Sequence, residues 1–137
     1  MPLDVIHQPE RDLTLFTLWG TPSVAEILHA YRDAKESHGL TKHTIWDSRR
    51  ASVSHLTEHD LSMLNYFIAL IQNQDPERVG GRSALLFSGV GDAVRFWNYA
   101  KLNYRVPQRL QVVLSMEDAL AWVEQGVVPQ KDIRSLV

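Results

Sequence analysis

The feature that most constrains the fold of this chain is the alternation of short β-prone runs with segments of helical periodicity. Two β-prone runs come first, Leu3–Val5 and Leu13–Trp19, joined by the turn-prone residues 8–12. This pattern predicts an antiparallel hairpin. Helical and strand-like segments then follow one another. Strands separated by helices need crossover connections, so the order β-β-α-β-α-β-α-β-α predicts an α/β fold with a mixed, mostly parallel sheet of about five strands covered by helices.

The first two helices are predicted from apolar stripes and from start signals. The stripes are Val24, Ile27, Leu28, Tyr31 and Ala34 in the first helix, and Leu61, Leu64, Phe67, Ile68 and Ile71 in the second. Ser23 has the spacing of a capping box before the first helix, and Thr21 ahead of a proline is the alternative start. Gly39 supplies the stop. Thr57 and Asp60 have capping-box spacing before the second helix.

Three strands and two helices complete the predicted order. The strands are residues 43–47, 84–87 and 110–114; the helices open at 88–92 and at Ser115, and the last closes at Gly126. The run 84–87 is apolar throughout, which is typical of a central strand covered on both faces. The tail has no clear period. We therefore predict one domain over residues 1–126 and a C-terminal tail over 127–137.

Composition excludes several functional classes. The chain has 137 residues and a net charge of −2, from 14 Lys+Arg and 16 Asp+Glu. This balance lacks the basic footprint of a general nucleic-acid binder. The absence of cysteine excludes disulfides, thiolate metal sites and a cysteine nucleophile. No signal-peptide pattern opens the sequence, and no apolar run approaches a membrane span. We expect a cytoplasmic protein without integral membrane association.

Three stretches resemble the SpoIIAA-like group of STAS domains, a class that contains bacterial anti-anti-sigma factors. They are Ile45-Trp46-Asp47, Leu56-Thr57-Glu58-His59-Asp60-Leu61 and Met116-Glu117-Asp118-Ala119-Leu120-Ala121-Trp122-Val123. The resemblance runs from Leu3 to about Val123. It implies a regulatory or protein-interaction module without enzymatic chemistry or cofactor. In anti-anti-sigma factors, a serine at the start of the helix after the third strand is phosphorylated; here Leu56 stands at that position, and Thr57 is the hydroxyl nearby.

Polar residues after the predicted strand 43–47 are the first candidate site. Asp47 ends that strand at the carboxyl edge of the sheet, where open α/β folds bind ligands, and Ser48 and two arginines follow. Together they suit a small anionic or polar ligand. The structural alternative, which we favour, has Asp47 accepting loop amides while the arginines are solvated. Ser54 and Thr57 are regulatory candidates, although Thr57 is better explained as a helix cap.

The glycines after strand 84–87 are a weaker candidate. Gly89 and Gly91 open a helix, whose exposed N–H groups favour an anion. The dinucleotide fingerprint is incomplete, however, and Asp92 places a carboxylate where a phosphate would sit. A tight turn with a cap is the better interpretation. His55 and His59 are four residues apart, but Thr57 caps between them, so we predict no metal site.

Aromatic residues crowd the third predicted helix. One helix face buries only part of the set Phe96, Trp97 and Tyr99, so the rest would line an apolar groove or a self-association surface. Core packing is the favoured role of Trp97. Our first hypothesis is therefore a regulatory or protein-interaction module with a protein partner or a second copy. The alternative is Sec14-like binding of a small apolar ligand or lipid under the third helix. An enzyme using Asp47 and His55 is the least favoured.

Overall fold

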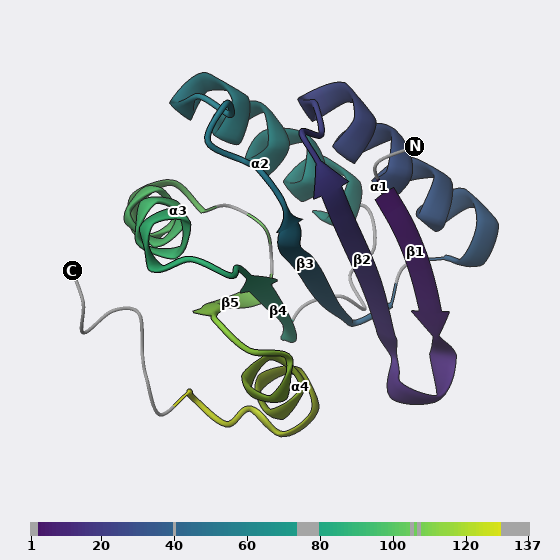
Figure 1. Cartoon of the computed structure of the whole chain (residues 1–137). Coiled ribbons are helices and arrows are strands. Elements are labelled where there is room, and N and C mark those ends of the chain that lie inside the picture. Colours follow the sequence, from purple (N-terminus) through teal and green to yellow (C-terminus); the bar gives the residue numbers. More distant parts are fainter. Residues whose placement is uncertain (1–2, 40, 74–79, 105, 107, 130–137) are drawn as a thin grey trace.

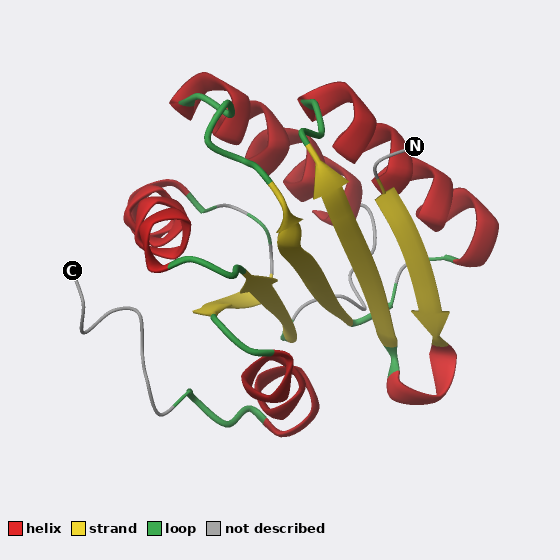
Figure 2. Ribbon diagram, viewed as in Figure 1, coloured by secondary structure: helices red, strands yellow, loops and turns green. Residues whose placement is uncertain are grey.

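The computed structural model describes residues 3–39, 41–73, 80–104, 106 and 108–129. Figures 1 and 2 show how its helices and strands are arranged. The elements are β1 (Leu3–Gln8), a 3-10 turn (Pro9–Arg11), β2 (Leu13–Gly20), α1 (Val24–His38), β3 (His43–Ala51), α2 (Glu58–Asn73), β4 (Gly81–Leu86), α3 (Val90–Asn103), β5 (Gln108–Val113) and α4 (Met116–Gln125). The predicted α/β class and element order are confirmed.

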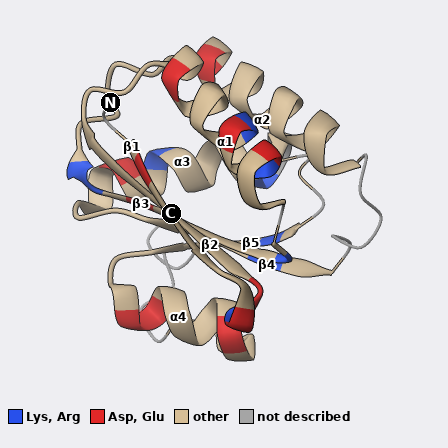
Figure 3. Cartoon of the chain, turned by 90° about the vertical axis from the view of Figure 1, so that its right-hand side faces the viewer, with Lys and Arg blue, Asp and Glu red and all other residues tan. Residues whose placement is uncertain are grey.

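The five strands form a single sheet in the order β1-β2-β3-β4-β5. β1 and β2 are antiparallel, with Leu3 opposite Leu18, and the other three pairs are parallel. Right-handed crossovers between neighbouring parallel strands place every connecting helix on the same side of a sheet. Accordingly α1, α2 and α3 lie on one face, and α4, which follows the last strand, covers the other (Figure 3).

Each face of the sheet has its own apolar core. We call the side covered by α1, α2 and α3 the three-helix face, and the opposite side the α4 face. Alternation along β4 shows the division: Ala84 and Leu86 pack beneath α4, whereas Leu85 and Phe87 belong to the three-helix side. The core of the α4 face consists of Leu13, Ile45, Ala84, Leu86, Val113, Ala119, Trp122 and Val123. The predicted central strand is thus covered on both faces.

Local hydrogen bonds explain where the helices begin. The Ser23 side chain accepts from the Glu26 amide at 3.1 Å, and the Glu26 carboxylate accepts from the Ser23 amide at 3.0 Å. This is a complete capping box, so α1 begins at Val24 and the alternative start at Thr21 is wrong. Gly39, with φ of 75°, ends the helix in a conformation that glycine adopts without strain.

Several boundaries and one buried position differ from the sequence prediction. The strand predicted over 43–47 continues to Ala51, because β2 extends to Gly20 and pairs with it there. β5 covers Gln108–Val113 rather than 110–114. Phe67, predicted to widen the buried stripe of α2, is instead 39% exposed on the outer side of that helix. The apolar side chain of Phe67 is therefore not part of the core.

Two other predictions are met only partly by the described residues. The predicted tail is described as far as residue 129, where it follows α4 without forming a helix or strand; residues 130–137 lie outside the description. The division at residue 126 remains a prediction. Within the described part of the chain, none of the helices has the length and apolar character needed to cross a membrane.

Candidate functional site

A largely apolar cavity lies on the three-helix face, between α2, α3 and strands β3 to β5. Its volume is about 130 Å³. Residues from the helices line it at Leu61, Leu64, Asn65, Ile68, Gln72, Phe96, Tyr99 and Ala100, and residues from the sheet line it at Trp46, Ser48, Ser83, Leu85, Gln108 and Leu110. Well-packed interiors rarely hold voids larger than a water molecule, so this space is a departure from close packing.

Small side chains explain why the cavity exists. Ser48 of β3, Ser83 of β4 and Ala100 of α3 all line it, at positions where a larger apolar residue would fill the gap between the sheet and the helices. The alternation of the strands orients Ser48 and Ser83 toward the three-helix face. The cavity is therefore encoded by residue size at three positions that are distant in sequence.

Polar contacts connect α2 to α3 beside the cavity. The Ser62 and Tyr99 hydroxyls form a hydrogen bond, and the Asn65 side-chain amide donates to the Asn103 carbonyl. Tyr99 and Asn65 also line the cavity. The two helices are thus joined by hydrogen bonds next to a space that apolar side chains do not fill.

A buried hydrogen-bond network closes the end of the cavity near the amino ends of β3, β4 and β5. The Thr44 hydroxyl lies 3.1 Å from the Ser83 hydroxyl and 3.3 Å from Gln108 Oε1, and it has one proton to donate between them. Gln72 Nε2 donates to Gln108 Oε1 at 3.1 Å. Gln108 Nε2 donates to the Lys42 carbonyl at 2.8 Å. Four buried polar side chains therefore form one connected group.

One acceptor in this network has no partner. Gln72 is only 2% exposed, and its Oε1 atom finds no hydrogen-bond partner among the described residues. Buried polar atoms are nearly always hydrogen-bonded, and an unpaired one costs about 1–3 kcal/mol. This acceptor, on a side chain that lines the cavity, is therefore open to a hydrogen-bond donor there.

Tyr104 adds a hydroxyl to the same end of the cavity. Burial raises its pKa well above the usual range, against the smaller opposing effect of its hydrogen bond with the Ser83 side chain. The phenol is therefore neutral across the physiological pH range. Neither it nor the other side chains of the network carries a charge there.

Two of the three predicted aromatic residues line the cavity. Phe96 and Tyr99 form part of its wall, and Phe96 packs on Phe87 with 4.8 Å between ring centroids. Trp97 does not line the cavity; it is partly buried against the core of the three-helix face. This agrees with the core role favoured for Trp97 and limits the predicted pocket residues to Phe96 and Tyr99.

Asp47 lies on the α4 face, on the opposite side of the sheet from the cavity. Its carboxylate accepts from Arg49 Nε at 3.0 Å, from Arg49 Nη2 at 2.9 Å and from the Arg49 amide at 3.1 Å. Burial acts to raise the Asp47 pKa, but these bonds to Arg49 outweigh it and hold the pKa below its ordinary value. Arg49 thus binds both carboxylate oxygens, and a ligand here would compete with its guanidinium.

Ser48 and Ser54 do not join Asp47 in one site. Ser48 is buried and faces the cavity, because neighbouring residues of a strand point to opposite faces. Ser54 is exposed in the loop after β3, where its hydroxyl lies 3.4 Å from that of Ser52. The predicted polar cluster after the strand is therefore divided among two faces of the sheet and a loop.

Thr57 is the N-cap of α2. Its hydroxyl accepts from the Asp60 amide at 3.1 Å, and the Asp60 carboxylate accepts from the Thr57 amide at 2.9 Å. The bond from the Thr57 amide lowers the pKa of the Asp60 carboxyl. Thr57 is exposed, whereas Leu56, which the resemblance to SpoIIAA-like domains aligns with a phosphoserine, is buried at 3% exposure. A modifying enzyme would thus find Leu56 without a hydroxyl and Thr57 engaged in the cap.

Gly89 and Gly91 lie exposed at the start of α3. A Cβ atom at either position would meet no atom within 4 Å, and Gly89 caps the helix without a side-chain hydrogen bond. No close approach of backbone to another group requires glycine here. Further along α3, the Arg95 guanidinium donates to the Val53 carbonyl at 3.0 Å, which connects α3 to the loop before α2.

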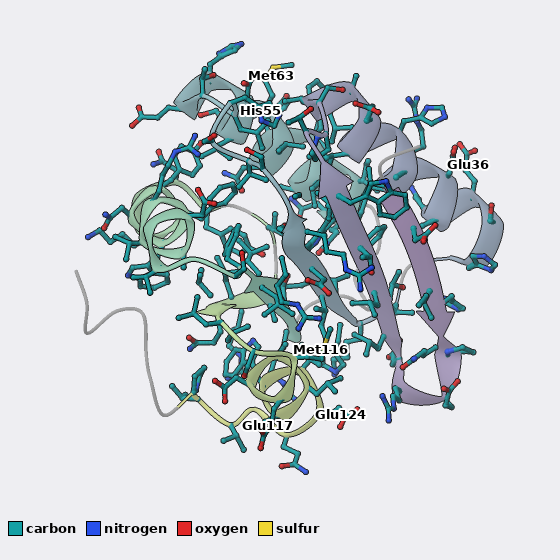
Figure 4. The ribbon with its side chains drawn as sticks, in the orientation of Figure 1. Glu36, His55, Met63, Met116, Glu117 and Glu124 are labelled. Carbon is teal, nitrogen blue, oxygen red and sulfur yellow. The ribbon has the colours of Figure 1, made fainter. Side chains whose placement is uncertain are left out.

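The two spaced histidines do not converge on a metal. The His55 imidazole Nε2 lies 2.7 Å from the Pro22 carbonyl and donates to it, which occupies that nitrogen (Figure 4 labels His55). Within the described parts of the chain, no group of three or more His, Asp or Glu side chains is placed to hold a metal ion.

Sequence reasoning missed the polar end of the cavity. Thr44, Ser83 and Gln108 occupy buried positions of β3, β4 and β5, and Gln72 continues the buried side of α2. Four polar residues at core positions were a readable signal, because polar groups are buried only where they find partners. That they meet depends on strand register, which places Thr44 opposite Ser83.

Comparison with known proteins does not assign the chain to a family. No protein-family model matches the chain, and no curated protein matches it either.

Proposed function

We propose that this chain binds a small apolar ligand in the cavity between α2, α3 and the sheet. The observation that carries the proposal is the cavity itself, about 130 Å³ and walled mainly by aliphatic and aromatic side chains. An apolar cavity of roughly 150 Å³ stays dry and accepts a molecule the size of benzene. A ligand of one aromatic ring or a short aliphatic chain fits this volume.

The apolar walls favour such a ligand over a charged one. Leu64, Ile68 and Leu85 offer no hydrogen bonds, and an unpaired charge taken from water into such a site is strongly disfavoured. A ring that enters loses its contact with water and gains dispersion contacts that the empty space lacks. For a ligand of seven heavy atoms we expect Kd on the order of 0.1–1 mM, which is within the ceiling for small ligands.

A titration with toluene, followed by two-dimensional amide NMR of the full chain, tests the proposal. We expect saturable shifts in β4, α2 and α3 and none in α4. Ala100→Leu is the matched variant, because it fills the cavity from α3 while keeping an apolar helix former at that position. It should abolish the shifts while the chain remains folded. Absence of saturable binding, or equal shifts in α4, would contradict the proposal.

A second candidate function, a protein-interaction module, is supported by the outer side of α2. Four large apolar side chains form an exposed stripe there at steps of three and four residues. They are Met63, Tyr66, Phe67 and Leu70, with exposures of 37%, 59%, 39% and 44%; Figure 4 labels Met63 at the outside of the helix. No charged residue occurs from 61 to 73. We call this surface the α2 stripe; surface helices normally carry charges on such a face.

The occupant we propose for the α2 stripe is a second copy of the chain. In a two-fold interface, residues near the axis meet their own copies, so any charge there would meet a like charge. The uncharged stripe avoids that repulsion, and its aromatic and methionine content is typical of interfaces. A charged partner or an anionic membrane would find no complementary charge along these residues.

Sedimentation over about 10–500 μM tests self-association. We expect a monomer–dimer equilibrium that Phe67→Glu shifts to monomer, because the variant brings two carboxylates together at the interface. Ala25→Glu, an exposed position on α1, is the matched control and should leave the equilibrium unchanged. A chain that stays monomeric at the highest concentration contradicts this candidate. Both candidates describe a non-enzymatic module, as the resemblance to SpoIIAA-like domains implies.

A further inference from the structure

We infer that the cavity prefers ligands that carry one hydrogen-bond donor, a small alcohol or phenol, which Gln72 recognises through its side-chain oxygen. The inference rests on the proposed function, since it names the chemistry of the ligand for the same cavity. It is carried by a different observation: a buried acceptor without a partner on a side chain that lines the apolar cavity.

The neighbouring hydrogen bonds fix which end of the Gln72 amide is unpaired. The Lys42 carbonyl only accepts, so the nitrogen of the Gln108 amide must face it, at 2.8 Å. The oxygen of Gln108 then faces Gln72, which must present its own nitrogen, at 3.1 Å. Reversing the Gln72 amide would bring two oxygens together. The free atom is therefore an acceptor, Oε1, and it calls for a donor.

The rest of the network leaves Gln72 Oε1 without a donor. Thr44 has one hydroxyl proton, and its two acceptors within reach are Ser83 and Gln108. The Gln108 amide nitrogen is directed to Lys42. An N–H or O–H brought in by a ligand would complete the network, whereas a wholly apolar ligand would leave the oxygen unpaired and keep water away from it.

The position of the network also orients the ligand. Gln72 and Gln108 are at the end of the cavity near the amino ends of β4 and β5, whereas Phe96 and Leu64 line its apolar part. A ligand with a donor at one end and a ring or short chain at the other matches this division. A charged head group would not, because the four network side chains, Thr44, Ser83, Gln72 and Gln108, are all uncharged.

Toluene and p-cresol, which differ by one hydroxyl group, test the inference on the full chain by the same NMR titration. In water the hydroxyl of p-cresol is solvated, so p-cresol matches or exceeds the affinity of toluene only if the cavity supplies an acceptor. We expect p-cresol to bind at least as tightly as toluene. Gln72→Met should weaken p-cresol by about 3–10-fold, the usual value of one neutral hydrogen bond, and change toluene by less than about twofold.

Gln111→Met is the matched control. Gln111 is a buried glutamine of β5 that does not line the cavity, so its replacement should leave the ratio of the two affinities unchanged. In Gln72→Met, Gln108 Oε1 still lies 3.3 Å from the Thr44 hydroxyl, which can donate to it.

The outcomes separate the inference from the proposed function. If toluene binds and p-cresol binds about tenfold more weakly, the inference is wrong and the apolar binding function stands. If p-cresol binds well but Gln72→Met leaves the ratio unchanged, the assignment to Gln72 is wrong. If neither compound binds, both the function and the inference that rests on it fail.

Discussion

The two faces of the sheet are built from the same strands but are packed differently. On the α4 face, one helix closes a core in which Ile45, Leu86 and Ala119 are each 0% exposed. On the three-helix face, three helices cover the sheet and still leave a cavity of about 130 Å³. The number of covering helices therefore does not decide how completely a face is filled. The sizes of the facing side chains do, and between α2, α3 and the sheet they leave room.

Truncating one leucine on each face gives the largest expected contrast. Leu86→Ala removes a fully enclosed side chain beneath α4, and we expect it to lower the free energy of unfolding by about 3–5 kcal/mol. Leu85→Ala, the neighbour that borders the cavity, should cost about 1–2.5 kcal/mol, because part of its surface already meets empty space. Urea unfolding measures both. Equal losses would mean that the faces are packed alike.

Enlarging one alanine on each face should give effects of opposite sign. Ala119→Leu forces extra volume into the filled α4 core and should destabilise the chain by about 1–3 kcal/mol. Ala100→Leu fills the cavity and should stabilise it by about 0.5–2 kcal/mol. Calorimetry of thermal unfolding shows whether each variant raises or lowers the stability of the chain. A loss of stability in both variants would argue that the space around Ala100 is not available.

Removing one helix cap on each face should give smaller and similar losses. Thr57→Ala uncaps α2 and Ser115→Ala uncaps α4, whose Asp118 amide lies 3.1 Å from the Ser115 hydroxyl. Each should cost about 1 kcal/mol. Hydrogen exchange should rise in the first turn of the affected helix only. Thr57→Ser should restore protection, and its failure to do so would refute the capping role of Thr57.

The smallest expected difference is in pH dependence. Burial, followed by the Arg82 charge, lowers the pKa of His43, whose Nδ1 accepts from the Arg82 amide at 2.9 Å. The folded chain then binds fewer protons than the unfolded chain, so this contribution to stability is complete above the unfolded pKa of about 6.5 and falls as pH drops below it. His43 shares a strand side with Ile45, on the α4 face.

Unfolding at two pH values on either side of that pKa checks the sign. His43→Gln should reduce the loss of stability on acidification. Ligand affinity should stay constant over the same range, because none of the network side chains on the three-helix face titrates there. If acidification lowers the free energy of unfolding of His43→Gln as much as that of the unchanged chain, His43 is not the source of the pH dependence.

Local signals made the fold predictable, whereas the cavity depends on tertiary spacing. The caps at Ser23, Thr57 and Ser115 were predictable because each is closed by hydrogen bonds within three residues. The element order followed from periodicity in the same way. No local pattern, however, indicates that Ser83 and Ala100, from different elements, border one space.

The candidate site was predicted only in part. Ser48 was a candidate, but as a neighbour of Asp47 in a polar site rather than as part of an apolar cavity. Phe96 and Tyr99 were found because aromatic residues exceed what one helix face can bury. For Asp47, the favoured structural role agrees with the Arg49 amide donating to its carboxylate, but the expectation that the arginines are only solvated is wrong for Arg49, whose guanidinium also donates to it. Gln72 was missed, because its role depends on Gln108, which lies in another element.

The most direct test of the central claim is a crystal structure of the full chain under xenon pressure. Xenon occupies apolar cavities of this size without needing polar contacts. We expect xenon density between α2, α3 and the sheet, in contact with Ile68 and Leu85, and none in the core beneath α4. Density on neither face, with the side chains of Ile68, Leu85 and Phe96 meeting across the proposed space, would contradict it.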